Sequence, residues 1–247
     1  PMLWDFCVGS PLSDTTGNYL SCVNWVALVT EHSGEAGNKS ITPSVRRDSA
    51  LKYKGAAKYD VVVTDPPYYD AIPYSDLMDF FYIWLRRTFF GNSSAFDLAF
   101  EDSLGTKWNH KENDGELIDD ASRHQGDRAK SKQSYEDGMF DAFKACHKSL
   151  EHSGRLVIVF AHKHPDAWET LVSAIIRAGF VVDGSWPIQT EMGNRSRAHG
   201  SAALSSSVWL VCKKRPETAR PGWDNRVLEE MREKIMDQLR EFWDAGI

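Results

Sequence analysis

Apolar residues in this chain form short continuous runs and longer stretches with a helical repeat. Two runs, Val61–Thr64 and Leu156–Phe160, are rich in β-branched residues. Each is long enough for a buried strand and too short for a helix. Two further runs, Phe180–Val182 and Ser207–Cys212, predict a last pair of antiparallel strands.

Between these runs, apolar residues recur every three or four positions, which predicts amphipathic helices. These helices are expected at 18–30, 75–89, 134–150, 168–176 and 223–242. The aromatic stripe of the second helix is assigned to core packing rather than to a base-stacking platform. Ser134 is expected to begin the third helix and Gly154 to close it. Because strands and helices alternate, we predict an α/β domain with a mainly parallel sheet.

The composition divides the chain into three parts. We predict an N-terminal helical and turn segment at 1–44, an α/β core at 45–215 and a C-terminal amphipathic helix at 216–247. Within the core, residues 91–133 have little periodicity and many charges, which predicts a polar insertion. This insertion either closes over a substrate or touches a phosphate backbone, or it is a solvated loop.

The overall composition limits the class of protein. With 247 residues, 42% hydrophobic and 26% charged, the chain is typical of a soluble globular protein. The net charge of −6 argues against a large basic face, so any contact with nucleic acid must use a local patch. We find no membrane-length apolar run and no signal peptide. The four cysteines form no C-x-x-C pair, which favours reduced thiols in a cytoplasmic protein.

The most informative stretch is Asp60–Asp70, which reads DVVVTDPPYYD. Two consecutive prolines stiffen the loop after the valine run and free backbone carbonyls from any sheet ladder. The Asp65 carboxylate and a freed carbonyl, expected to be that of Pro66, can each accept an N–H of a planar amine. Both hold the amine more tightly as it becomes cationic during attack on an electrophile. Tyr68 offers a face for an extruded base. The plainer interpretation is a rigid turn with a capping aspartate.

This loop resembles the Asp-Pro-Pro-Tyr signature of the S-adenosylmethionine-dependent amino-methyltransferases. The run DPPYYDAIPYSDLMDFFYIWLRR is similar to large adenine-specific DNA methylases that carry a zinc ribbon, as are WDFCVGSPLSDTTGNY and SAALSSSVWLVCKKR. The resemblance implies the later strands of a Rossmann-like class I methyltransferase fold. In that family the glycine cofactor motif and the zinc ribbon lie further upstream. Here no two glycines are separated by a single residue, so the chain has no G-x-G.

The resemblance also implies a set of site residues. The catalytic residues would be Asp65, Pro66, Pro67 and Tyr68, the cofactor-binding residues Asp48, Ser49 and Asp65, and the substrate-binding residues Tyr69, Tyr74, Arg195 and Arg197. Asp48 is expected on a short strand at 45–51 that ends in an acid, and the alternative is a surface turn. Arg195, Arg197 and His199 form a basic patch suited to phosphates. We assign His162 and His164 to a loop rather than to a metal site.

The function implied is methyl transfer from S-adenosylmethionine to the 6-amino group of a flipped adenine in DNA. The signature also serves N4-cytosine and some RNA amino-methyltransferases. A different possibility is a methyltransferase-like nucleic-acid-binding subunit or fragment that is inactive alone, and the missing G-x-G favours it. We expect an upstream segment or a partner subunit to supply the glycine motif and the first strands.

Overall fold

The computed structural model describes residues 10, 12–15, 18–37, 40–41, 43–44, 49–51, 53, 55, 57–70, 72–94, 97, 100, 116–189, 206–219 and 224–244. The chain forms two compact units, Pro1–Arg46 and Arg47–Ile247. The first unit contains helix α1, Tyr19–Gly37, which agrees with the predicted helix and extends it. Asn18 begins this helix, because its Oδ1 accepts a hydrogen bond from the Ser21 amide at 2.8 Å.

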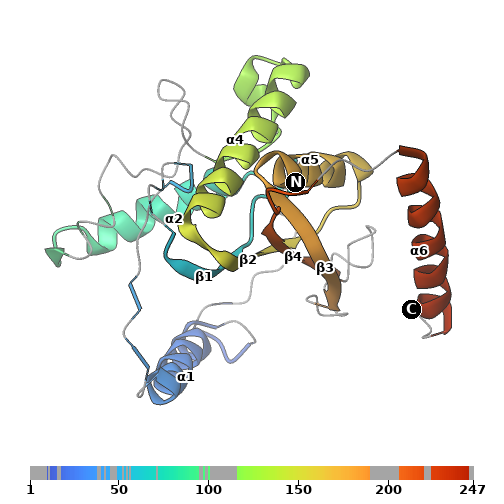
Figure 1. Cartoon of the computed structure of the whole chain (residues 1–247). Coiled ribbons are helices and arrows are strands. Elements are labelled where there is room, and N and C mark those ends of the chain that lie inside the picture. Colours follow the sequence, from blue (N-terminus) through green and yellow to red (C-terminus); the bar gives the residue numbers. More distant parts are fainter. Residues whose placement is uncertain are drawn as a thin grey trace. The chain divides into compact units, whose positions relative to one another are not determined.

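The second unit holds the sheet (Figure 1). In chain order its elements are β1 Tyr59–Thr64, α2 Tyr74–Phe89, the 3₁₀ helix η2 Ala121–His124, α4 Arg128–Ser149, β2 Leu150–Phe160, α5 Pro165–Arg177, β3 Phe180–Gln189, β4 Ser206–Lys214 and α6 Asp224–Asp244. The four strands predicted at 61–64, 156–160, 180–182 and 207–212 and the helices around them are therefore present. A further short strand predicted at 45–51 is not seen at 49–51, and residues 45–48 lie outside the described residues. Every described side chain of α6 is exposed.

The four strands lie in the order β1-β2-β4-β3. β1 is parallel to β2, with Val62 opposite Leu156. β4 is antiparallel to both of its neighbours, β2 and β3. The predicted antiparallel last pair is confirmed, whereas the predicted mainly parallel sheet is wrong. The last strand returns between β2 and β3, and a hydrophobic pattern alone does not reveal that insertion.

The core lies on one face of this sheet, where α4 and α5 pack (Figure 1). On that face β2 contributes Leu156, Ile158 and Phe160, each fully buried, and they alternate with half-buried residues. Helix α4 adds Tyr135, Met139 and Phe143, and α5 adds Leu171, Ala174 and Ile175. Burying each large apolar side chain contributes about 1.5–3 kcal/mol, so this layer fixes the positions of β2, α4 and α5.

The opposite side of β1 is open in the described part of the chain. Val61 is 54% exposed and Val63 is 62% exposed, while Val62 packs against the core. The expectation of a fully buried strand is therefore wrong for one face of β1. The core-packing assignment of the α2 stripe is also wrong, because Phe80, Phe81, Trp84 and its neighbours are exposed. β1 is also an edge strand, because it pairs with β2 alone among the described strands.

Helix α4 begins six residues before the predicted start and ends earlier than predicted. Asp127 caps it, accepting a hydrogen bond from the Lys130 amide at 3.0 Å. Gly154 does not close the helix but lies inside β2. A side chain there would approach the Asp60 carbonyl oxygen of the neighbouring strand to 3.1 Å. The glycine thus serves the close pairing of β1 with β2.

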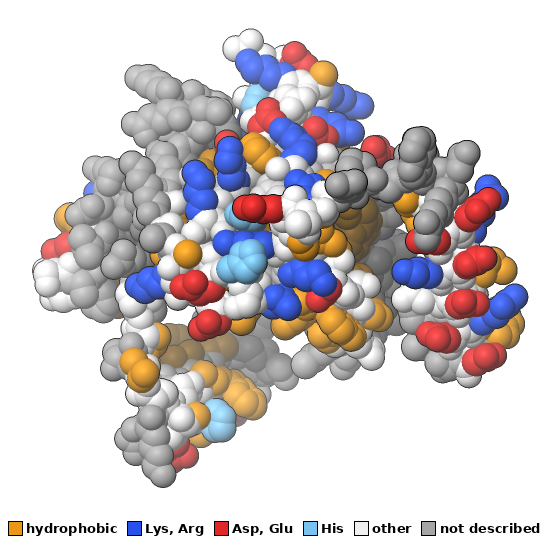
Figure 2. All heavy atoms as spheres, viewed as in Figure 1, with side chains coloured by type: hydrophobic (Ala, Val, Ile, Leu, Met, Phe, Trp, Pro, Cys, Tyr) orange, Lys and Arg blue, Asp and Glu red, His pale blue; other side chains and the backbone are white. Residues whose placement is uncertain are grey.

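The end of the predicted polar insertion is part of the folded core. Residues 116–120 lead into η2, and 128–133 form the first turns of α4. Ile118 and Ser131 are buried in this stretch, so for 116–133 the solvated-loop alternative is wrong. Basic and acidic side chains are interspersed over the face seen in Figure 2. Among the described helices, none has the length and apolarity to cross a membrane.

Candidate functional site

The Asp-Pro-Pro-Tyr loop begins directly after β1, at the end of the only parallel pair among the described strands. The carboxyl ends of such strands are where α/β proteins usually bind ligands. Asp65 is exposed and Pro66 is buried. The half-buried ring of Tyr68 meets Phe160 at the end of β2 edge to face, with ring centres 5.4 Å apart. The loop therefore presents its carboxylate to solvent while its aromatic end is braced by the core.

The two proline carbonyls of this loop have different surroundings. The Pro67 oxygen accepts hydrogen bonds from the Tyr135 hydroxyl at 2.7 Å and from the Tyr69 amide at 3.0 Å. The Pro66 oxygen receives no hydrogen bond from any described residue. Of the two carbonyls, that of the buried Pro66 is thus the one without a hydrogen-bond donor among the described residues.

Tyr69 anchors the loop to the rest of the core. Its backbone has a φ of +58°, in the left-handed region. Only 9% of the residue is exposed, and its ring lies edge-on to Tyr135 and His162. Burial and a hydrogen bond to Asp119 raise the pKa of its hydroxyl far above 10. Most of the ring of this predicted substrate-binding residue is therefore buried against other core residues.

Tyr74 lies in the first turn of α2, and its side chain is 45% exposed. Partial burial, followed by the nearby Asp65 and Glu116 carboxylates, raises the pKa of the Tyr74 hydroxyl. The structure therefore brings Asp65 and Tyr74, two predicted site residues, into one electrostatic environment.

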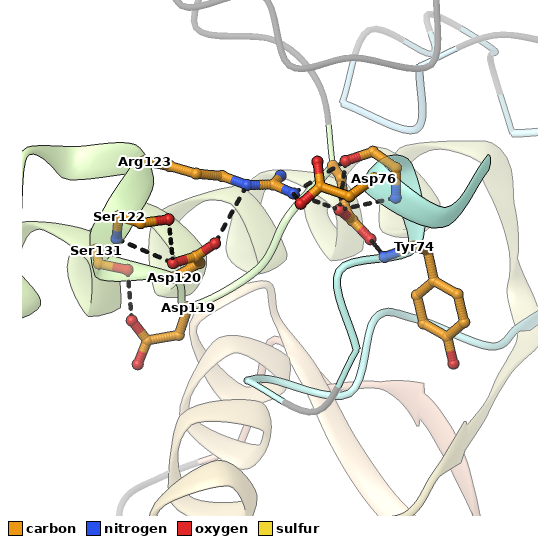
Figure 3. Close-up of polar contacts among 9 residues, drawn as sticks. Tyr74, Asp76, Asp119, Asp120, Ser122, Arg123 and Ser131 are labelled. Atoms are coloured by element: carbon orange, nitrogen blue, oxygen red, sulfur yellow. Dashed lines mark hydrogen bonds and ion pairs between the residues drawn. The ribbon is translucent and has the colours of Figure 1, made fainter. Parts of the chain in front are cut away.

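A carboxylate from the supposed insertion holds the start of α2. Glu116 accepts hydrogen bonds from the Tyr74 amide at 2.6 Å and from the Ser75 amide at 3.2 Å. Such bonds satisfy amides that a helix leaves unpaired at its first turn. Arg123 lies 3.1 Å from Glu116 and 3.7 Å from Asp76. Figure 3 shows its guanidinium group extending towards Asp76 at the start of α2. The segment 116–123 thus fixes the helix that leaves the signature loop.

The same segment contacts the loop itself. The Asp119 amide donates to the Tyr69 carbonyl at 3.2 Å, and Ser131 of α4 donates to the Asp119 carboxylate at 2.5 Å (Figure 3). A pocket of about 440 Å³ opens beside these groups. Its lining residues are Asp70, Pro73, Ile118, Asp119, Asp120, Ala121 and Arg128. This pocket has room for a small planar group next to the signature loop.

Three of the predicted site residues, Asp48, Arg195 and Arg197, lie outside the described residues, as does His199 of the basic patch. Ser49 is described and is partly buried. Tyr135, Glu116 and Asp119 did not emerge from the sequence as site residues. Tyr135 was expected on a helix, but its partner at Pro67 is 68 positions away, and no local pattern reveals such a contact.

The thiols of Cys146 and Cys212 lie inside the protein and are not activated. Burial raises the pKa of Cys146 and of Cys212 to about 11, so both are protonated near neutral pH. His162 and His164 lie after β2, as the sequence indicated. Within the described ranges no three His, Cys, Asp or Glu side chains gather in a group that could hold a metal ion. The described groups at the loop include the Asp65 carboxylate, the Pro66 carbonyl, the Tyr68 ring and the His162 imidazole.

A comparison with protein-family models finds no match to this chain, and a comparison with curated proteins finds none either. The function must accordingly be argued from the signature loop and its surroundings.

Proposed function

We propose that this chain carries the amino-acceptor site of an S-adenosylmethionine-dependent methyltransferase that acts on the 6-amino group of adenine in DNA. The observation that carries the proposal is which acceptor groups of the Asp-Pro-Pro-Tyr loop already have hydrogen-bond donors within the protein. Asp65 is exposed and the Pro66 carbonyl receives no described hydrogen bond, while the neighbouring Pro67 carbonyl is occupied twice. Two acceptors in consecutive residues suit the two N–H bonds of an exocyclic amine.

The chain's own residues would act on the amine as follows. Asp65 and the Pro66 carbonyl would each accept one N–H and so orient the nitrogen lone pair towards the methyl donor. As the C–N bond forms, the nitrogen becomes positively charged and both acceptors hold it more tightly, which lowers the barrier. Tyr68 would stack on the flipped base. S-adenosylmethionine supplies the methyl group when bound, and by the family resemblance Asp48 and Ser49 would contribute to its site.

The sheet supports the proposal that this is the later part of a Rossmann-like class I fold. In a doubly wound sheet of order 3-2-1-4-5-6, strand four lies between strands one and five. If β1 is strand four and β2 is strand five, the open edge of β1 is where strand one would pair. In the described sheet, β1 is at one end of the strand order and has β2 as its one neighbour. We propose that an upstream segment or a partner subunit supplies this strand and the glycine motif. We also propose that the protein acts in the cytoplasm.

A second candidate function is that of a nucleic-acid-binding subunit that has the methyltransferase fold but does not catalyse. The absence of a G-x-G from the sequence favours it. One measurement separates the two functions. If the protein expressed from its whole gene transfers a methyl group to DNA, it is an enzyme, and if it binds DNA without methyl transfer, it is a binding subunit. Identification of the methylated base would also separate adenine from cytosine, and DNA from RNA.

The experiment is methyl transfer from tritiated S-adenosylmethionine to unmethylated DNA, measured for wild type and for Asp65→Ala. Because Asp65 is exposed after the strand, the substitution should leave the thermal unfolding unchanged. We expect kcat to fall by about 10²–10³, as for loss of one donor or acceptor that stabilises developing charge. Asp60→Ala, an exposed carboxylate within β1, is the matched control and should keep wild-type activity. Full activity in Asp65→Ala would exclude the proposed site.

A further inference from the structure

The hydroxyl of Tyr135 is placed so that it controls the signature loop from helix α4. The residue is 1% exposed. Its hydroxyl donates to the Pro67 carbonyl at 2.7 Å and accepts from the Tyr69 amide at 3.2 Å. The Tyr69 amide is also 3.0 Å from the Pro67 oxygen. One buried oxygen thus bridges both backbone groups at the turn of the loop.

This bridge lies where the backbone needs support. A non-glycine residue in the left-handed region is strained by its side chain, and it persists when surrounding contacts enforce it. At Tyr69, which has a φ of +58°, the enforcing contacts are the Tyr135 hydroxyl and the Asp119 amide. The Tyr69 ring also packs edge-on against the Tyr135 ring, with centres 5.3 Å apart. The same tyrosine therefore supports the turn through its ring and through its hydroxyl.

We infer that Tyr135 is a positioning residue that determines which proline carbonyl receives the substrate amine. By occupying the Pro67 oxygen and the Tyr69 amide, its hydroxyl fixes the peptide planes on the far side of the turn. The Pro66 oxygen is then left as the acceptor beside Asp65. This inference rests on the proposed function, and Tyr135 itself acts only through the loop.

The variant Tyr135→Phe tests the inference, because it keeps the ring packing and removes only the hydroxyl. Ser149→Ala is the matched control. Ser149 is also buried on α4, and its hydroxyl bonds a backbone carbonyl, that of Cys146 at 3.0 Å, away from the loop. The first readout is amide hydrogen exchange of the full chain. In Tyr135→Phe we expect exchange at residues 68–70 to rise about tenfold relative to the β2 core, and we expect no such local change in Ser149→Ala.

The second readout is methyl transfer by the protein expressed from its whole gene. Because misplacing a reacting group by about 1 Å can cost 10²-fold, we expect kcat to fall about tenfold to a hundredfold with the KM for DNA nearly unchanged. An unchanged kcat in Tyr135→Phe would overturn the positioning role alone, as would exchange that rises equally throughout the core. Wild-type protein that transfers no methyl group overturns the proposed function, and the positioning role falls with it even where the loop exchange changes as expected.

Discussion

The imidazole of His162 and the carboxylate of Asp70 lie 2.9 Å apart, Nε2 to Oδ1, and join the loop after β2 to the end of the signature loop. The His164 amide donates to Nδ1 of His162 at 3.1 Å, so Nδ1 is unprotonated and Nε2 carries the hydrogen that bonds Asp70. The His162 carbonyl also accepts from the Trp168 indole at 2.8 Å. Two neighbouring loops at the site are thus held in one arrangement.

The face of Tyr68, rather than its hydroxyl, is expected to serve the substrate. Tyr68→Phe keeps the ring and its edge contact with Phe160, and it should retain most activity. Tyr68→Ala removes the ring, and loss of one base–aromatic stack should cost about 1–3 kcal/mol of DNA affinity. Binding titrations with one DNA duplex compare the variants. If Tyr68→Phe weakened DNA binding as much as Tyr68→Ala does, the hydroxyl rather than the ring face would contact the DNA.

The exposed side of β1 predicts a contrast between two substitutions in adjacent strands. Val63→Thr should change the free energy of unfolding by no more than about 0.5 kcal/mol, since Val63 is 62% exposed. Ile158→Ala, in the buried layer of β2, should cost about 2–5 kcal/mol. Urea denaturation of the 247-residue chain measures both. A loss of about 2 kcal/mol from Val63→Thr would mean that another part of this chain covers that face of β1.

Acid should destabilise the fold partly through His147. Burial, followed by the positive charges of Lys214 and Arg215, lowers the pKa of His147 below its ordinary 6.5. As the pH falls below about 6.5, His147 takes up a proton in the unfolded chain before it does so in the folded chain. The free energy of unfolding is therefore highest above about pH 6.5. It decreases as the pH falls from the pKa of the unfolded chain to the lower pKa of the folded chain. His147→Gln should flatten the decline of the unfolding temperature below pH 6.5. The exposed His152→Gln is the control, and an equal slope in all three proteins would contradict the assignment.

The isolated chain should bind S-adenosylmethionine very weakly and be inactive alone. Cofactor affinity in such folds depends on a glycine turn that lets the backbone approach the ligand, and this sequence has no G-x-G. A single hydrogen bond to a charged group, as expected of Asp48, is worth about 1.5–3 kcal/mol, whereas even millimolar affinity needs about 4 kcal/mol. Calorimetry on the 247-residue chain is the measurement. Micromolar binding would place the cofactor site elsewhere, and restored activity on adding the upstream segment would support the proposal.

The hydrophobic pattern predicted which segments become strands and helices, because that pattern is a local property of the chain. It did not predict which side of β1 and α2 would be covered, since an apolar stripe shows the need for a partner and not where the partner is. The double proline made the Asp65–Tyr68 loop recognisable. Its supports at Tyr135 and Glu116 are 68 and 42 positions from the groups they bond, and contacts of that kind come only from the tertiary fold.

Among the described strands, β1 has one edge without a partner, and this edge bears on how the protein folds in the cell. An apolar strand with free backbone donors and acceptors is a template for strands of other chains. The run YDVVVT carries a single charge, which protects it poorly from such pairing. A chain whose β1 edge stays unpaired would therefore be prone to aggregation, and chaperones and proteases would act on it.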